Sequence, residues 1–315
     1  MEITRAALPG RRLGRSGLTV SALGLGGAGL GSSYGELDDD AAIETVRAAL
    51  EGGITYIDTS PRYGESERRL GLALRDGLRD RVVLSTKVGA HPAWPGDYSA
   101  ATTYRSVESS LRLLCTDHLD LVLVHDPPDL QQALGHEGAV DALEDLKRQG
   151  VIGAIGLGVR DHALHAEAIR SGRVDAVLTF LDYTPLRTAA ADTLLPLAQA
   201  RDVGVINGSP LAMGLLGGAD PDELLRSGPA WAAPQYARDI AAARRLWRWA
   251  REHDLDLQAV ALQFSIREPR IATTIVGAKS ADEVRQNLRA AAMSLPIWTW
   301  DELERARRAA PEESA

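Results

Sequence analysis

Eight short apolar segments recur along this chain, and turn-forming residues bound each of them. They occupy residues 21–27, 54–60, 81–87, 119–126, 152–158, 174–180, 203–208 and 271–277. Several are apolar almost throughout, which is typical of strands buried on both faces of a parallel sheet. Amphipathic helix patterns lie between them, and the clearest spans residues 38–53, where an Asp precedes the apolar stripe and two glycines end it.

Eight strand–helix repeats favour one closed barrel, because right-handed crossovers between parallel strands close naturally at that number. The competing architecture is an open doubly wound sheet, in which the glycines of residues 24–31 would form a dinucleotide loop. No acidic residue ends a strand about 20 residues later, and no helix opens directly from the glycines, so this match is weak. We therefore predict an α/β fold, a (β/α)8 TIM barrel, as a single domain over residues 1–315.

Two segments go beyond the simple repeat. Residues 8–20 precede the first barrel strand and contain two turn signals, which predict a hairpin that plugs the bottom of the barrel. Residues 209–269 separate the seventh and eighth strands and begin with a stretch rich in Gly and Pro. We expect a helix at 239–253 within an otherwise long loop, and such loops are usually functional.

Composition excludes several classes of partner. The 315 residues carry a net charge of −8, and basic residues cluster only near the termini, so nucleic acid and anionic membrane are not expected partners. Neither a signal peptide nor an apolar run of about 18 residues is present, which predicts a cytoplasmic protein. The single cysteine, Cys115, excludes an intrachain disulfide, and its neighbours predict a buried, inert thiol. No His-x-His pair marks a metal site at an early strand.

Four polar side chains follow the ends of three successive predicted strands. Asp58 ends one strand and Tyr63 follows five residues later, while Lys87 and His125 end the next two. If the strands are parallel, all four converge on the C-terminal face, where barrel enzymes place their chemistry. The ammonium of Lys87 would lower the pKa of the Tyr63 phenol from its usual value near 10, and Asp58 would keep that ammonium charged.

This group suits proton transfer at a carbonyl or an alcohol, with His125 donating a hydrogen bond to the substrate oxygen. It contains no nucleophile, so a bound nicotinamide is the expected carrier of electrons. The predicted reaction is a hydride transfer between that cofactor and a carbonyl or alcohol carbon.

Five motifs resemble the aldo-keto reductase family and occur in the family's order. They are IDTSPRYG (57–64), STK (85–87), LVHDP (123–127), GVINGSPLAMGLL (204–216) and IVGAKSADEVRQN (275–287). The resemblance implies a (β/α)8 barrel that binds NAD(P) at its C-terminal face without a Rossmann motif. It also implies that Tyr63 is the general acid/base, that Lys87 and Asp58 set its pKa, and that His125 orients the substrate oxygen.

Within the family, residues 174–186 and 209–216 are similar to a branch of aldose 1-dehydrogenases. The resemblance implies oxidation of C1 of a sugar hemiacetal to a lactone, usually with NAD. Two alternatives stay open, an NADPH-dependent carbonyl reductase and a cofactor-sensing regulatory or binding subunit. The expected partner is a small sugar or carbonyl compound, and both a monomer and a homo-oligomer are compatible with the sequence.

The resemblance also identifies candidate cofactor contacts. The last strand-to-helix turn favours phosphate, because backbone amides and a helix N-terminus meet there. Glu283 stands where NADP-preferring members often have Arg and favours NAD, although Lys279 can still pair with a 2′-phosphate. The full set of candidates is Ser209, Leu211, Gly277, Lys279, Ser280, Glu283, Gln286 and Asn287.

Four further positions are candidates for the substrate pocket, namely Tyr34, Trp94, Asp126 and Tyr183. The chain departs from the family pattern where side chains usually hold the nicotinamide. The residues at these positions are Gly158, Val159, Phe180 and Gly208. Orientation of the nicotinamide is therefore expected to depend on Phe180 or on backbone groups.

Overall fold

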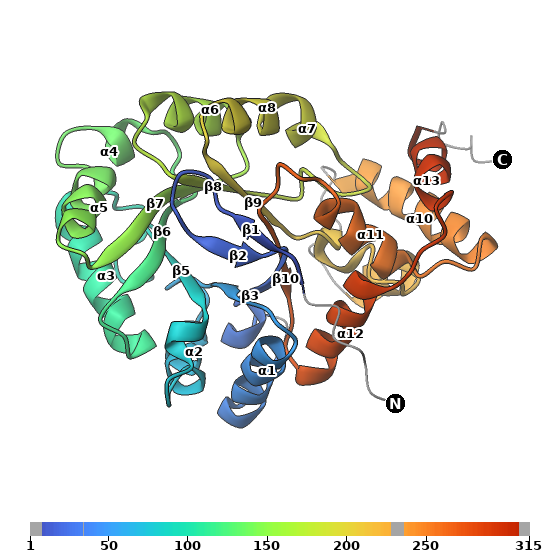
Figure 1. Cartoon of the computed structure of the whole chain (residues 1–315), viewed down its shortest axis with the longest axis horizontal. Coiled ribbons are helices and arrows are strands. Elements are labelled where there is room, and N and C mark those ends of the chain that lie inside the picture. The colour runs from blue at the N-terminus through green and yellow to red at the C-terminus, as the bar shows by residue number, and fades with distance from the viewer. Residues whose placement is uncertain (1–7, 34, 228–235, 309–315) are drawn as a thin grey trace.

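Eight parallel strands form a closed barrel in this computed structural model, which describes residues 8–33, 35–227 and 236–308 (Figure 1). Each strand pairs with the next in sequence, and β10 pairs with β3 to close the ring. Seven of the eight apolar segments contain a whole barrel strand, and the segment 81–87 contains all of its strand except Val88, which confirms the predicted fold. The strands are β3 (Leu23–Gly26), β4 (Tyr56–Asp58), β5 (Val83–Val88), β6 (Leu119–His125), β7 (Ile152–Gly158), β8 (Ala176–Phe180), β9 (Gly204–Gly208) and β10 (Thr273–Gly277).

Helices surround the barrel and bury their apolar faces against it (Figure 1). The predicted start of α1 is confirmed, because Asp38 caps it by accepting a hydrogen bond from the backbone N–H of Ala41. The surrounding helices are α1 (Asp39–Glu51), α2 (Ser66–Ala73), α3 (Ala100–Leu114), α4 (Gln131–Leu134), α5 (Ala139–Arg148), α6 (His162–Ser171), α7 (Ala189–Thr193), α8 (Leu195–Ala200) and α12 (Ala281–Ala292), with short 3-10 turns η1 (Gly29–Gly31) and η2 (Arg79–Arg81).

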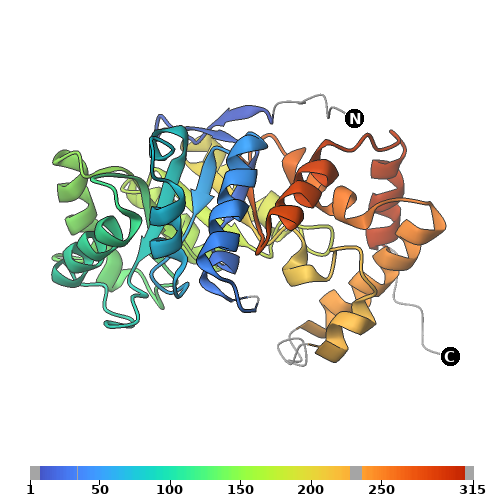
Figure 2. The ribbon, with the colours of Figure 1, turned by 90° about the horizontal axis from the view of Figure 1, so that it is seen from below.

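The N-terminal hairpin closes one end of the barrel, as predicted. Its strands are β1 (Gly10–Arg12) and β2 (Thr19–Ser21), which pair antiparallel. Leu13 and Val20 are fully buried and pack against side chains of the barrel interior such as Tyr56. Gly204 permits this contact, because a Cβ at that position would lie 2.6 Å from the Leu13 side chain. Figure 2 shows the hairpin on one side of the barrel and the first, gold part of the segment after β9 on the opposite side.

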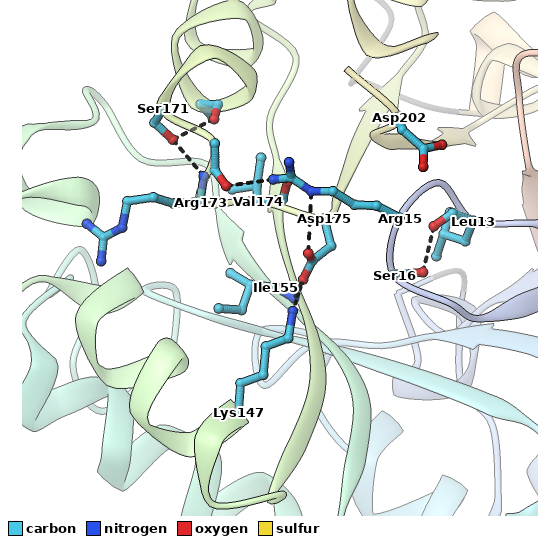
Figure 3. A network of polar contacts seen from close by, with 12 residues as sticks. Leu13, Arg15, Ser16, Lys147, Ile155, Ser171, Arg173, Val174, Asp175 and Asp202 are labelled. Atoms are coloured by element: carbon cyan, nitrogen blue, oxygen red, sulfur yellow. Dashed lines mark hydrogen bonds and ion pairs between the residues drawn. The ribbon is translucent and has the colours of Figure 1, made fainter. Parts of the chain in front are cut away.

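A network of polar contacts fastens the hairpin to the N-terminal end of β8 (Figure 3). Arg15 donates hydrogen bonds to the backbone carbonyls of Gly172 and Val174, at 2.7 and 2.6 Å, and lies 3.6 Å from the Asp175 carboxylate. The Asp175 carboxylate also accepts from Lys147 Nζ at 2.5 Å and from the backbone N–H of Ile155 at 2.9 Å. One carboxylate thus links the hairpin, α5, β7 and β8.

The segment between β9 and β10 is largely helical. The helix predicted at 239–253 is present, but the expectation that the rest of the segment is a long loop was wrong. It contains η3 (Ala212–Gly214), α9 (Pro221–Ser227), α10 (Ala237–Glu252) and α11 (Leu257–Ile266). The helices persist because they share an apolar cluster with α13 (Thr299–Arg308), in which Leu246, Val260 and Leu303 are almost fully buried. This group of helices stands beside the barrel in Figure 1.

The expectation of a buried thiol was also wrong. Cys115 is exposed, because α3 ends at Leu114 and the cysteine follows as its C-cap in a left-handed conformation, with φ of 52°. The thiol therefore falls outside the apolar stripe of the helix. Within the described ranges, the chain contains no helix that is both long and apolar enough to cross a membrane.

Candidate active site

A cavity of about 950 Å³ opens at the C-terminal ends of the barrel strands. The side chains of Asp58, Tyr63, Lys87 and His125 all line it, so the structure brings together the four residues predicted to carry the chemistry. Asp58 and His125 are the last residues of β4 and β6, and Lys87 is the penultimate residue of β5. The parallel topology therefore delivers three of these side chains to one face, and the turn after β4 delivers Tyr63.

Asp58 and Lys87 form a buried ion pair, and each is only 2% exposed. Lys87 Nζ donates to Asp58 Oδ2 at 2.6 Å and to the backbone carbonyl of Thr59 at 2.7 Å. Ser85, the partner of Asp58 in the β4–β5 register, donates its hydroxyl to Asp58 Oδ1 at 2.7 Å. Burial, the largest single effect, lowers the pKa of Lys87, but the charges and hydrogen bonds of Asp58 and Tyr63 together outweigh it and raise the pKa of the lysine. Lys87 is therefore an ammonium at neutral pH.

Tyr63 lies beside this ammonium, with Lys87 Nζ 4.9 Å from the centre of its ring. Burial raises the pKa of Tyr63 above its usual value, and the positive charge of Lys87 lowers it only in part. The sequence-based expectation of a lowered pKa was wrong in its net sign, because it did not include the cost of burying a phenolate. Gly31 packs directly on the Tyr63 backbone, since a Cβ at that position would lie 1.6 Å from the Tyr63 carbonyl oxygen.

His125 is neutral at physiological pH. Burial and the positive charges of Lys87 and Arg62 lower the pKa of His125 to about 3. Its Nδ1 lies 3.2 Å from Ser60 Oγ, and its Nε2 lies 3.6 Å from the Asp126 carboxylate. A nearby carboxylate favours the tautomer with hydrogen on Nε2, and Ser60 then donates to Nδ1. In that tautomer His125 offers a hydrogen-bond donor to the cavity.

The predicted substrate-pocket residues are not all in one place. Asp126 lines the cavity. Trp94 does not; it stacks on His91 in its own loop, with ring centres 4.5 Å apart. Tyr183 does not line it either, because its ring packs on Phe264 and its hydroxyl bonds Glu268. Tyr34 lies outside the described residues.

The predicted cofactor contacts fall into two groups. Those that line the cavity are Ser209, Leu211, Gly277, Lys279 and Glu283. Ser280 instead caps α12 by accepting from the backbone N–H of Glu283. Gln286 and Asn287 lie on the same helix and are joined by Gln258 of α11, which accepts from Gln286 at 2.7 Å and donates to Asn287 at 2.7 Å.

The departures from the family pattern have clear positions. Gly158, Phe180 and Gly208 line the cavity, whereas Val159 is buried in the core and donates its backbone N–H to the Leu178 carbonyl. Phe180 is therefore the large side chain among them that faces the cavity. A planar nicotinamide fits against such a ring better than against the two glycines.

Sequence reasoning missed several residues of the site. Ser60 and Arg62 lie inside the first motif, where their positions beside Asp58 and Tyr63 were a usable signal. Tyr98 gave no such signal, because its hydroxyl reaches the backbone carbonyls of His125 and Asp126 through a tertiary contact from the loop after β5.

Comparison with known proteins identifies the family. The profile of the aldo/keto reductase family, whose members use nicotinamide cofactors, matches residues 22–308. The D-threo-aldose 1-dehydrogenase of a Pseudomonas species is 31% identical, over 93% of this chain and 95% of that protein. The L-galactose dehydrogenase of Arabidopsis thaliana is 33% identical, over 89% and 87%. The crystal structure of PA4992 from Pseudomonas aeruginosa is 31% identical with a TM-score of 0.67, covering 92% of this chain and 98% of that one. This protein belongs to the aldo/keto reductase family.

Proposed function

We propose that the protein is an aldose 1-dehydrogenase, which oxidises C1 of a sugar hemiacetal to an aldonolactone. Family membership makes it an NAD(P)-dependent oxidoreductase of sugar or carbonyl compounds. The observation that carries the narrower proposal is the similarity to the D-threo-aldose and L-galactose enzymes, each of which spans nearly the whole chain. We retain one domain over residues 1–315, a cytoplasmic location, and a monomer or homo-oligomer as predictions.

The four side chains at the cavity support this reaction through one proton transfer. A bound NAD(P) would accept hydride from C1. The anomeric O–H proton passes to the phenolate oxygen of Tyr63, so that C1 would become a carbonyl. His125 donates from Nε2 to the same substrate oxygen and fixes its direction. Because burial raises the pKa of Tyr63, oxidation is expected to be faster at alkaline pH, where the phenolate is populated.

The cavity walls fit a nicotinamide dinucleotide. Three glycines, Gly26, Gly27 and Gly277, line the cavity where β3 and β10 pair, which allows close backbone approach. The N-terminus of α12 begins at this turn, and its orphan amides favour a phosphate group. A bound nicotinamide supplies the hydride acceptor, and the residues of the chain supply binding and proton transfer.

We propose NAD as the preferred cofactor. Glu283 lines the cavity from the first turn of α12, and its carboxylate accepts from the backbone N–H of Lys279 at 2.9 Å. A carboxylate held there repels a 2′-phosphate and accepts from a ribose hydroxyl. Changing Glu283 to Gln is expected to improve NADP binding at least several-fold relative to NAD, as measured by nucleotide titration. An unchanged preference would remove Glu283 from the explanation.

A substrate panel tests the proposal. Purified protein is incubated with L-galactose, L-fucose and related aldoses, with NAD and NADP in parallel, and reduced nicotinamide is followed by absorbance. Tyr63→Phe is expected to abolish turnover and to leave nucleotide binding nearly intact. Activity near wild type in that variant would reject the proton-transfer role.

The panel also separates the alternatives. Consumption of NADPH with aldehydes, without sugar oxidation, would favour a carbonyl reductase. The supporting observation is that Lys279 lines the cavity, because its ammonium would attract a 2′-phosphate. Nucleotide binding without turnover would favour a regulatory subunit.

A further inference from the structure

Asp126 has a backbone conformation that non-glycine residues rarely adopt. Its φ is 45°, directly after His125 at the end of β6. Three contacts hold it there. The backbone N–H of Asp126 donates to the Gly158 carbonyl at 2.8 Å, and the Tyr98 hydroxyl lies 3.0 Å from the Asp126 carbonyl and 2.8 Å from that of His125. Strained residues of this kind persist where the surrounding structure fixes them, often at functional sites.

This conformation places the Asp126 carboxylate beside the expected position of the reacting oxygen. Asp126 Oδ2 lies 3.6 Å from His125 Nε2, the atom that donates to that oxygen. The side chain is 41% exposed and lines the cavity. Within the part of the chain that the structure describes, no side chain or backbone group donates a hydrogen bond to this carboxylate, whereas the Asp58 carboxylate receives two.

We propose that Asp126 selects substrates with a hydroxyl on the carbon next to the reacting carbon, by accepting a hydrogen bond from that hydroxyl. The inference rests on the proposed function and narrows its substrate class to α-hydroxy carbonyl compounds and the corresponding sugars. Tyr63 and His125 fix the reacting oxygen. A hydroxyl on the adjacent carbon is three bonds from that oxygen, so it lies on the same side of His125 as the Asp126 carboxylate, 3.6 Å from Nε2, and comes within its reach. A substrate with an apolar group there would cover the carboxylate without providing a donor.

The charges around the reacting position favour a neutral substrate. Lys87 is paired with Asp58. Arg62 also lines the cavity, and its positive charge lowers the pKa of Asp126, whereas burial raises it. The positive and negative side chains near His125 therefore balance. A polyhydroxylated neutral compound fits this environment better than a sugar acid or a sugar phosphate.

The test compares two aldehydes that differ by one hydroxyl. Lactaldehyde and propanal are reduced with NADH or NADPH, and the ratio of their kcat/KM values is measured in wild type, Asp126→Asn and Asp126→Ala. A hydrogen bond to a charged group corresponds to roughly a 10- to 100-fold preference. We expect lactaldehyde to be preferred by about that factor in wild type. The ratio should fall to within about threefold of unity in Asp126→Ala and to an intermediate value in Asp126→Asn, whose amide oxygen still accepts a hydrogen bond without the charge. Propanal reduction should change less than lactaldehyde reduction.

Asp129→Asn is the matched control, because Asp129 lies on the same segment, accepts from the backbone N–H of Gln131 and does not line the cavity. It should keep the wild-type ratio. Asp126→Gly, which tolerates positive φ, serves if the other variants unfold, and nucleotide titration verifies an intact cofactor site.

A wild-type ratio in Asp126→Ala, or an equal loss with both aldehydes, would overturn the inference. The two aldehyde assays contain no aldose, so their readout is independent of sugar oxidation. If no aldose is oxidised while the ratio collapses as expected, the aldose dehydrogenase proposal fails and the role of Asp126 stands.

Discussion

Replacing Lys87 by Met removes the charge closest to the proposed proton-transfer group. Lys87 Nζ lies 4.9 Å from the centre of the Tyr63 ring, and the lysine is only 2% exposed, so solvent screens the interaction little. Two unit charges about 5 Å apart at an effective dielectric constant of about 20 interact by about 3 kcal/mol. That energy corresponds to roughly two pKa units at Tyr63.

The direction of the change follows from the sign of each contribution. Burial raises the pKa of Tyr63, and Lys87 lowers it in part, so the variant should raise it further. Oxidation uses the phenolate, so kcat/KM for oxidation rises with pH through the pKa of Tyr63. In Lys87→Met this rise is expected at a pH about two units higher, and the fall in the rate of carbonyl reduction should move in the same direction. The assay is the pH dependence of kcat/KM in both directions.

A double variant distinguishes the effect of Lys87 on the pKa of Tyr63 from the effect of Asp58. Lys87→Met alone leaves a buried Asp58 carboxylate unpaired, which destabilises the fold and also raises the pKa of Tyr63. Asp58→Asn with Lys87→Met removes both charges, and its profile should move in the same direction by a smaller amount. Thermal unfolding confirms that each variant is folded at the assay temperature. If the profile of folded Lys87→Met superposes on that of wild type, Lys87 does not control the ionisation of Tyr63.

Three further variants test the scaffold and the site. Asp175→Ala leaves a buried backbone N–H without its acceptor and should lower the free energy of unfolding by about 2 kcal/mol in urea titrations; a change below about 0.5 kcal/mol would contradict the role of the network. Gly31→Ala should lower kcat at least tenfold with folding retained, because its Cβ would displace Tyr63, and full activity would reject that contact. The pKa of His125 is near 6.5 in the unfolded chain and about 3 in the folded protein, so the free energy of unfolding should fall as the pH drops through this window. His125→Gln should reduce this pH dependence, as measured by the midpoints of urea unfolding.

The barrel was predictable from the sequence because strands covered on both faces carry an uninterrupted apolar signal between turn residues. The helices after β9 were harder to predict, since Leu246 and Leu303 belong to an apolar cluster outside the barrel core and lie on helices far apart in sequence. The burial of Cys115 was mispredicted because it depended on where α3 ends, and boundaries are the least certain part of a pattern.

The candidate site divides along similar lines. Asp58, Lys87 and His125 lie at the ends of parallel strands. Their convergence could therefore be predicted from the alternation of strand and helix segments along the sequence. Loop residues depend on tertiary contacts that no local pattern contains. Tyr183 bonds Glu268, 85 positions along the chain, and Trp94 stacks within its own loop, so neither faces the cavity.

The two ends of the barrel carry different physical demands. At the C-terminal end, β6, β8 and β9 are each followed by a residue with positive φ, namely Asp126, Leu181 and Ser209. The first two donate their N–H groups to the last carbonyls of the neighbouring strands, so the sheet itself holds the strained turns. At the N-terminal end, Asp175 joins the hairpin to two strands without a positive φ of its own, although Asp202, which also bonds the hairpin, has a φ of 53° (Figure 3). Substitutions at Asp175 should therefore change stability at constant substrate preference. Asp126→Gly should change preference with little loss of stability, because glycine adopts a positive φ without strain.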